Sequence, residues 1–179
     1  MKKLNSIGLI MISLMLSLTP MFAQSSAKKT KIIEDSKMAK SEFIKSDALM
    51  QSLFEKAVGY VIFPNVGKGG LGIGAAAGNG VVYEGNSLIG MAKLSQLSIG
   101  FQAGGQAYRE VIFFESKAEL ERFKASQFEF AAQASAVAVT EGASANVKYA
   151  DGVMVFTMQK GGLMYEASIG GQKFRFTRL

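Results

Sequence analysis

The chain has 179 residues and a formal net charge of +6, and it contains no cysteine and no histidine. These absences exclude disulfides, thiol and Ser-His nucleophiles, haem ligation by histidine and ordinary zinc sites. The sequence therefore predicts no metal, no cofactor and no catalytic residues, because an enzyme would have to rely on carboxylates, lysine, tyrosine or serine alone.

The first 23 residues have the features of a secretory signal peptide. Two lysines follow the initial methionine, residues 7–18 are almost entirely apolar, and a break at 19–23 ends in a small residue. No cysteine follows that could carry a lipid, so we expect cleavage near Ala23 and release into the periplasm or the medium, with an uncleaved anchor as the alternative. Removing Lys2 and Lys3 lowers the charge from +6 to +4, which favours anionic surfaces but does not argue for nucleic acid.

Residues 24–35 form a polar and basic lead-in to a predicted amphipathic helix. Apolar and small residues recur at helical spacing at Ile32, Ile33, Ser36, Ala39, Phe43 and Ile44. Five lysines lie near or on the complementary surface: Lys28, Lys29, Lys31, Lys37 and Lys40. Asp47 is the expected N-cap of a second short helix with Leu53 and Phe54 on its apolar stripe. The two helices either cover a sheet, or the first lies on a bilayer with its lysines toward lipid phosphates.

A glycine-rich stretch, residues 58–84, is the centre of the predicted sheet. A short apolar strand is expected to end at Pro64, because proline cannot continue a sheet ladder. Beyond Lys68 the chain alternates, with a packed face of Leu71, Ile73, Ala75 and Ala77 and a bare face of Gly72, Gly74, Ala76 and Gly78. We interpret Gly67, Gly70, Gly72 and Gly74 as structural glycines that permit close approach of a backbone, a helix or a ligand.

Residues 67–72 also match the G-x-G-x-x-G pattern of dinucleotide-binding loops. No helical pattern follows them, and no acidic residue lies at the distance expected for ribose recognition. A Walker A loop is excluded as well, because Gly69 follows Lys68 where serine or threonine is required. The glycines are therefore interpreted as structural.

The rest of the chain is predicted to be mostly β. Residues 81–93 indicate a hairpin. Residues 96–107 alternate between two faces of a strand. The inward side chains are predicted to be Leu97, Ile99, Phe101 and Ala103, and the outward ones Gln96, Ser98, Gln102 and Gln106. Ser116 begins a capping box before a short helix, residues 151–169 indicate a hairpin, and a last strand covers 172–178. The predicted fold is α+β: a strongly curled antiparallel sheet or partial barrel over residues 36–179, covered by the N-terminal helices and one short mid-chain helix.

Three segments resemble the SYLF domain: AVGYVIFPNVGKGGLGIGAAAGNGVVYE, REVIFFESKAELERF and GGLMYEASIGGQKF. The resemblance runs from about Ser36 to Phe176 and consists of glycine and apolar spacing, so it identifies a fold better than an activity. It implies a non-enzymatic lipid-binding module, in which the basic helix and Lys68 would meet lipid head groups.

Three functions from different classes follow. The first is an exported lipid-binding module whose partners are phospholipids or other anionic lipids, with a predicted site at Lys28, Lys29, Lys31, Ile33, Lys37, Lys40 and Lys68. The second is an envelope scaffold that binds another protein. The third is a carboxylate hydrolase, but the acidic residues form no recognisable catalytic pair in the sequence.

Overall fold

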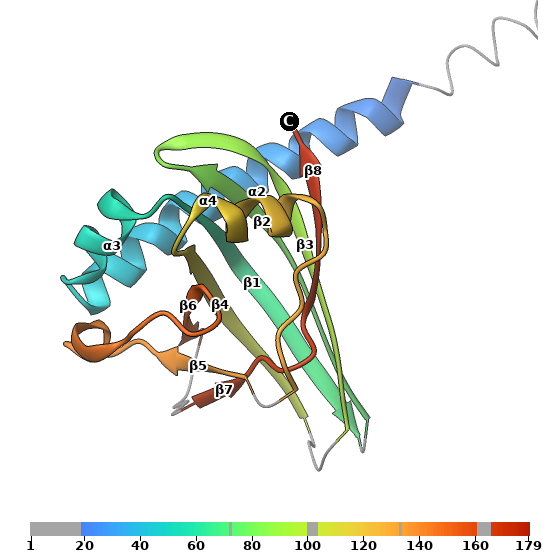
Figure 1. Cartoon of the computed structure of the whole chain (residues 1–179). Coiled ribbons are helices and arrows are strands. Elements are labelled where there is room, and N and C mark those ends of the chain that lie inside the picture. Colours follow the sequence, from blue (N-terminus) through green and yellow to red (C-terminus); the bar gives the residue numbers. More distant parts are fainter. Residues whose placement is uncertain (1–18, 72, 100–103, 133, 161–165) are drawn as a thin grey trace, which may run out of the picture.

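The computed structural model describes residues 19–71, 73–99, 104–132, 134–160 and 166–179 (Figure 1). The helices are α2 (Thr19–Ser46), α3 (Met50–Lys56), α4 (Lys117–Lys124) and the 3-10 helix η1 (Ala143–Asn146). The strands are β1 (Gly59–Leu71), β2 (Ile73–Glu84), β3 (Ser87–Ile99), β4 (Gly104–Phe114), β5 (Ser135–Ala138), β6 (Val153–Gln159), β7 (Glu166–Ser168) and β8 (Lys173–Arg178). The predicted α+β class is confirmed.

The strands form one eight-stranded sheet in the order β7-β5-β6-β4-β1-β2-β3-β8. Neighbouring strands are antiparallel except β5 and β6, which run parallel. Among the described residues no ladder joins the outer strands β7 and β8, so the predicted closure into a barrel is not confirmed. The predicted hairpin at 151–169 is wrong in its pairing, because β5 lies between β6 and β7 and pairs with both.

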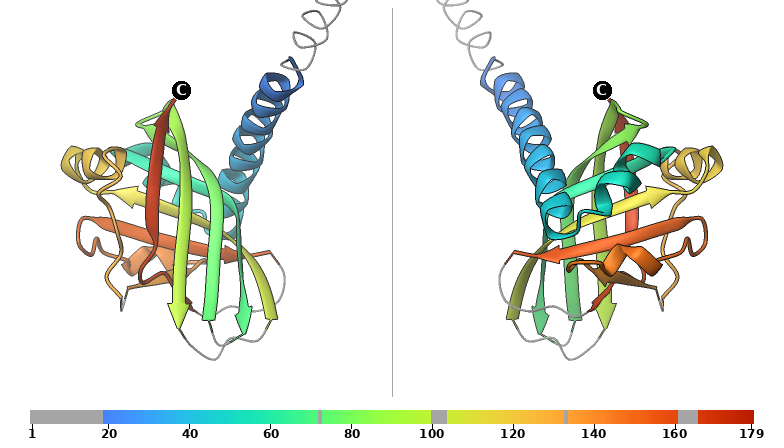
Figure 2. Two further views of the ribbon diagram at one scale, coloured as in Figure 1. Left: turned by 90° about the vertical axis from the view of Figure 1, so that its right-hand side faces the viewer. Right: turned by 90° about the vertical axis from the view of Figure 1, so that its left-hand side faces the viewer.

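Hydrophobic side chains fill both faces of the sheet, because the central strands alternate between two covers. We call the first cluster the α2-side core: Phe43, Phe54, Tyr60, Ile62, Val81, Val111, Phe113 and Phe156 are among its buried members. The second, the α4-side core, includes Val61, Phe63, Val66, Ala76, Ile112, Phe114, Phe123 and Phe174. Figure 2 shows α2 on one side of the long strands and α4 on the other.

Pro64 does not end the first strand, contrary to the prediction. β1 continues to Leu71, and its register shifts against both neighbours between residues 62 and 66. A β-bulge leaves one residue outside the ladder, so proline fits there without breaking the strand.

The packed and bare faces of the glycine strand are also the reverse of the prediction. Gly74, Ala76, Gly78 and Gly80 are buried, whereas Ile73, Ala75 and Ala77 are exposed. The same inversion occurs in β3, where Gln96 is buried and Leu97 is exposed. The cause lies far along the chain, because the Gln96 amide donates to the carbonyls of Ser168 and Gly170 and the segment carrying them covers that face.

Two helix starts were predicted, with different outcomes. Ser116 caps α4, and its hydroxyl accepts the backbone N–H of Ala118 at 3.1 Å. Asp47 does not cap α3, which starts at Met50 after Leu49. Its carboxylate instead accepts the Leu49 N–H and two bonds from Ser144. Helix α2 also begins earlier than predicted, so the polar lead-in is helical.

Candidate functional site

The N-terminal half of α2 projects from the body of the molecule (Figure 2). Residues 25–31 are exposed, and the helix first joins the α2-side core at Ile32 and Ile33. At 1.5 Å per residue, these seven residues extend about 10 Å beyond that contact. We call residues 25–31 the basic arm, because they carry Lys28, Lys29 and Lys31. Lys31 pairs with Asp35 at 3.3 Å, and both partners are accessible to water.

The apolar stripe of α2 is packed on the sheet, so it is not free to enter a membrane. Phe43 and Ala39 are buried in the α2-side core, and Ile33 packs against it. Glu42 also pairs with Arg109 of β4 at 2.6 Å. Of the two interpretations of this helix, the structure supports the cover of a sheet.

Lys40 points inward, unlike the other predicted lysines of α2. Its Nζ donates to the Tyr60 hydroxyl at 3.0 Å and lies 4.7 Å from the centre of the Phe54 ring. Burial lowers the pKa of Lys40, against an opposing effect of nearby Glu55. Lys37, by contrast, is exposed. Lys40 therefore stabilises the docking of α2 rather than lining an outer basic surface.

Lys68 lies on the opposite face of the sheet from α2. It pairs with Ala76 and follows Val66 by two residues, and both of these belong to the α4-side core. Burial lowers the pKa of the Lys68 ammonium. The structure therefore does not bring Lys68 together with the basic arm.

The predicted structural glycines occupy different environments. Gly67 is exposed, and a Cβ added there would meet no atom within 4 Å. At Gly70 an added Cβ would lie 2.1 Å from the Ile73 carbonyl oxygen, so close approach is required. Gly74 is buried. Gly72 lies outside the described residues.

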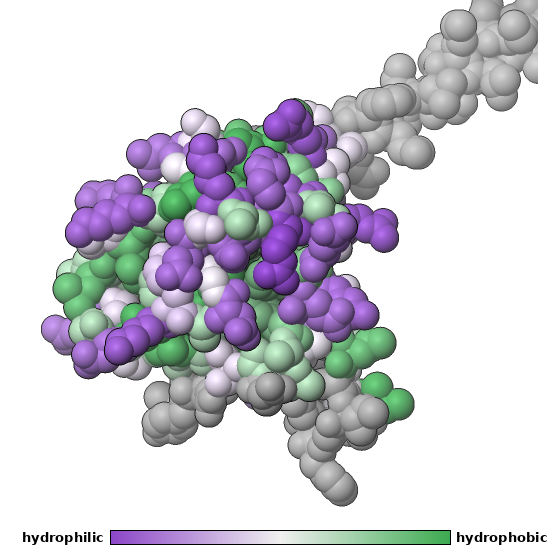
Figure 3. Space-filling view, in the orientation of Figure 1, coloured by the Kyte–Doolittle hydropathy of each residue, from purple (hydrophilic) through white to green (hydrophobic). Residues whose placement is uncertain are grey.

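Two apolar residues that the sequence predicted to pack inward are exposed instead. Ile73 is 69% exposed and Leu97 is 77% exposed, near the ends of the β1–β2 and β3–β4 hairpins. Figure 3 shows strongly apolar residues on the surface at this lower end of the molecule. The alternation at residues 71–77 was visible in the sequence, but it was assigned to the wrong face.

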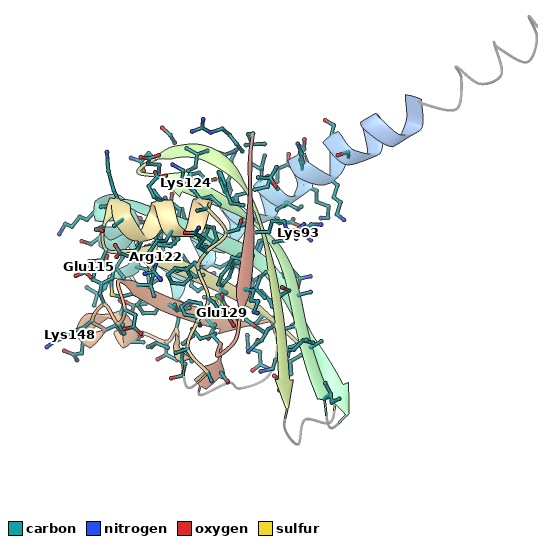
Figure 4. The ribbon with its side chains drawn as sticks, turned by 45° about the vertical axis from the view of Figure 1, so that its right-hand side comes forward. Lys93, Glu115, Arg122, Lys124, Glu129 and Lys148 are labelled. Carbon is teal, nitrogen blue, oxygen red and sulfur yellow. The ribbon has the colours of Figure 1, made fainter. Side chains whose placement is uncertain are left out.

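An open cavity of about 970 Å³ lies between α4, β5 and β6. Its apolar lining includes Phe128, Phe130, Val137, Val155 and Ile169. Its charged lining includes Glu119, Arg122, Glu129, Lys148 and Asp151, and Figure 4 shows Arg122, Glu129 and Lys148 on this side of the molecule. Glu129 already pairs with Lys173 at 3.5 Å, and Arg122 lies 5.6 Å from the Phe128 ring centre. An apolar floor with a mixed charged rim suits an amphipathic ligand.

Glu110 is the most perturbed carboxyl group that the structure describes. It is buried among the side chains of the α4-side core, and its Oε2 accepts a bond from the Gln172 amide at 3.0 Å. Burial raises its pKa to about 7. It does not line the cavity, so we assign it no catalytic role.

The described residues offer neither a metal site nor a membrane-spanning helix. No group of three or more acidic, histidine or cysteine residues is arranged to hold a metal ion in the part of the chain that the structure describes. Within the same residues, no helix combines the length and the apolarity needed to cross a bilayer.

The described residues form an open α+β sheet with α2 against one face and α4 against the other. The family model described as Ysc84, Las17-binding protein actin regulator, matches residues 95–178, from β3 to β8. Beta cell expansion factor A of Aeromonas veronii is 31% identical over 125 residues, which are 68% of this chain and 47% of that protein. The chain thus spans about half the length of this relative. It belongs to the SYLF (Ysc84) family.

Proposed function

We propose that this SYLF protein is an exported, non-enzymatic lipid-binding module that associates with anionic membrane surfaces through its basic arm. The observation that carries the proposal is the position of Lys28, Lys29 and Lys31, all exposed on a helix that projects beyond its contact with the sheet. The signal-like residues 1–23 support export, and the family's link to lipid binding supports the class of ligand.

The contact made by the basic arm is electrostatic, because the apolar stripe of α2 is already packed. Each lysine close to an anionic surface contributes about 1 kcal/mol, and salt screens charges beyond about 10 Å at 0.1 M. Three lysines therefore give reversible, salt-sensitive binding.

The test is co-sedimentation of the purified exported protein with phosphatidylcholine vesicles that contain or lack phosphatidylglycerol. A variant with Lys28, Lys29 and Lys31 changed to Glu should bind the anionic vesicles at least roughly 100-fold more weakly, because it loses about 1 kcal/mol per lysine and adds negative charge. A control with Lys56, Lys117 and Lys160 changed to Glu has the same net charge but an intact basic arm, and it should keep most of the binding.

Equal binding by the wild type and the basic-arm variant at low salt would rule out α2 as the lipid contact. It would favour the second candidate function, an envelope scaffold that binds a protein. The cavity beside β5 and β6 supports that alternative, because it is open and has both apolar and charged lining.

A further inference from the structure

The hairpin end of the sheet presents an uncovered apolar surface on the same face as α2. Side chains alternate between the two faces of a strand. On β2, Val81 belongs to the α2-side core, and the same face carries Ile73, Ala75 and Ala77. On β3, Met91 packs against that core, and Leu97 lies on the same face as Met91. All four are exposed. We call these four residues the apolar end. Figure 2 shows the end of β2 and β3 to which they belong on the opposite side of the molecule from the N-terminus of α2.

The surface beside the apolar end carries very small residues. Gly67 pairs with Ala77, and Gly69 pairs with Ala75 on one side and Gly105 on the other. A Cβ added at Gly67 or Gly105 would meet no atom within 4 Å. Nothing in the described part of the chain covers this face, so its apolar area remains available to a partner.

Two basic residues lie directly opposite each other on the same face. Lys93 of β3 pairs with Arg175 of β8, and both are exposed. Like charges in directly opposed positions destabilise a sheet. No carboxylate of the described residues lies within 4.0 Å of either, whereas the neighbouring Lys173 pairs with Glu129. The Lys93–Arg175 pair is therefore a place where an external anion would relieve repulsion.

The spacing between the basic pair and the apolar end is slightly longer than the depth to which apolar segments enter a membrane interface. Leu97 is four residues beyond Lys93 on the same strand, which corresponds to about 13 Å. Apolar segments that lie in an interface enter it by roughly 5–10 Å. With the hairpins directed at a bilayer, Ile73 and Leu97 reach the acyl boundary while Lys93 and Arg175 stay at the level of the phosphates.

We propose that the apolar end is a second lipid-contact surface, which enters an anionic bilayer with Ile73 and Leu97 and holds lipid phosphates with Lys93 and Arg175. This goes beyond the role of the basic arm, because it adds apolar insertion that salt does not screen. A second copy of the chain fits this surface less well, since a two-fold contact would bring the same basic pair together with itself.

The experiment measures binding to phosphatidylcholine–phosphatidylglycerol vesicles at low salt and in 1 M salt. A variant with Ile73→Ser and Leu97→Ser should lose about tenfold or more of the binding that persists in high salt, because it removes the inserted apolar area. The matched control is Met38→Ser with Leu49→Ser, since these residues are 57% and 49% exposed elsewhere, and its binding should not change.

A second measurement follows insertion directly. The chain has no cysteine, so the Leu97→Cys variant can carry an environment-sensitive fluorophore at one position, and Met38→Cys serves as the control. The probe at position 97 should shift to the blue on adding vesicles, and the probe at 38 should not. Lys93→Gln with Arg175→Gln should reduce the preference for anionic vesicles while leaving the melting temperature equal or higher.

The outcomes separate this proposal from that of the basic arm. The basic-arm variant, with Lys28, Lys29 and Lys31 changed to Glu, should lose binding at low salt and keep the binding that persists in 1 M salt. That result would support two independent lipid contacts. Wild-type binding by the Ile73→Ser, Leu97→Ser variant at both salt concentrations, or no shift of the probe at 97, would overturn the proposal. So would a wild-type dimer in sedimentation that this variant abolishes, because the surface would then be a self-contact.

Discussion

Asp47 accepts hydrogen bonds from both the backbone N–H and the hydroxyl of Ser144, at 2.8 and 2.6 Å. The two residues are 97 positions apart in the chain. Asp47 follows α2 and Ser144 lies in η1, so this buried contact joins the N-terminal helices to the segment between β5 and β6. Burial acts to raise the pKa of Asp47, but the bonds from Ser144 and from backbone N–H groups outweigh it and hold the pKa below its usual value.

Replacing Asp47 with Ala should destabilise the protein by about 3 kcal/mol. The change leaves the Ser144 N–H and hydroxyl buried without an acceptor, and unsatisfied buried groups cost about 1–3 kcal/mol each. Denaturant unfolding measures the effect. Asp35→Ala is the control, because it removes only the exposed pair with Lys31, and its stability should change by less than about 0.5 kcal/mol. Equal midpoints for both variants would contradict the role of Asp47.

Gly80→Ala should cost more stability than Gly67→Ala, although both glycines lie in central strands. A Cβ at Gly80 would be 2.4 Å from the Ile62 carbonyl oxygen and 2.7 Å from Phe63 Cδ1, so the backbone of β1 would have to move. Overpacking of this kind costs about 1–3 kcal/mol. At Gly67 the added methyl group meets open space. Thermal unfolding of the two variants checks the difference, and equal melting temperatures would remove the close-approach argument at Gly80.

The alternation of residues 71–77 predicted an extended strand correctly but not which face is buried. A period of two defines two faces, and only distant segments decide which of them is covered. Here the backbone around Ser168 and Gly170 covers the Gln96 face, while α2 covers only part of the other. The effect of Pro64 could not be predicted from the sequence for the same reason. The bulge that accepts this proline depends on the pairing of β1 with both of its neighbouring strands. The lysines of the basic arm were recognisable from their spacing in the sequence. The inward direction of Lys40 was not, because it depends on contacts with Tyr60 and Phe54.

Glu110 should make the protein less stable as the pH rises from about 4.5 to about 7. Its pKa in the folded state, about 7, lies above the usual value of 4.5, so the folded protein holds this proton more tightly than the unfolded chain. The stabilising contribution is complete below pH 4.5 and is lost as the pH rises through 7. Each pKa unit is worth about 1.4 kcal/mol, so the total is on the order of 3 kcal/mol. Denaturant unfolding across this range measures it.

Glu110→Gln is the matched variant for the pH effect, because it keeps the shape and an acceptor for the Gln172 amide but cannot ionise. Its stability should change less between pH 5 and pH 8 than that of the wild type, and it should be the more stable protein at pH 8. Parallel pH profiles for the two proteins would show that Glu110 is not the titrating group.

Ile33→Asp should destabilise the protein rather than weaken lipid binding alone. Ile33 packs against the α2-side core, so an aspartate there would place a charge against that apolar cluster. Loss of the apolar contact and partial burial of the charge together cost about 2–3 kcal/mol. Met38 is the control, because it lies on the same helix and is 57% exposed. Met38→Asp should change the stability by less than about 0.5 kcal/mol. Denaturant midpoints for the two variants show whether the apolar stripe of α2 is packed on the sheet. The opposite result would be a wild-type midpoint for Ile33→Asp together with weaker binding to phosphatidylglycerol vesicles. The apolar face of α2 would then leave the sheet to enter the membrane.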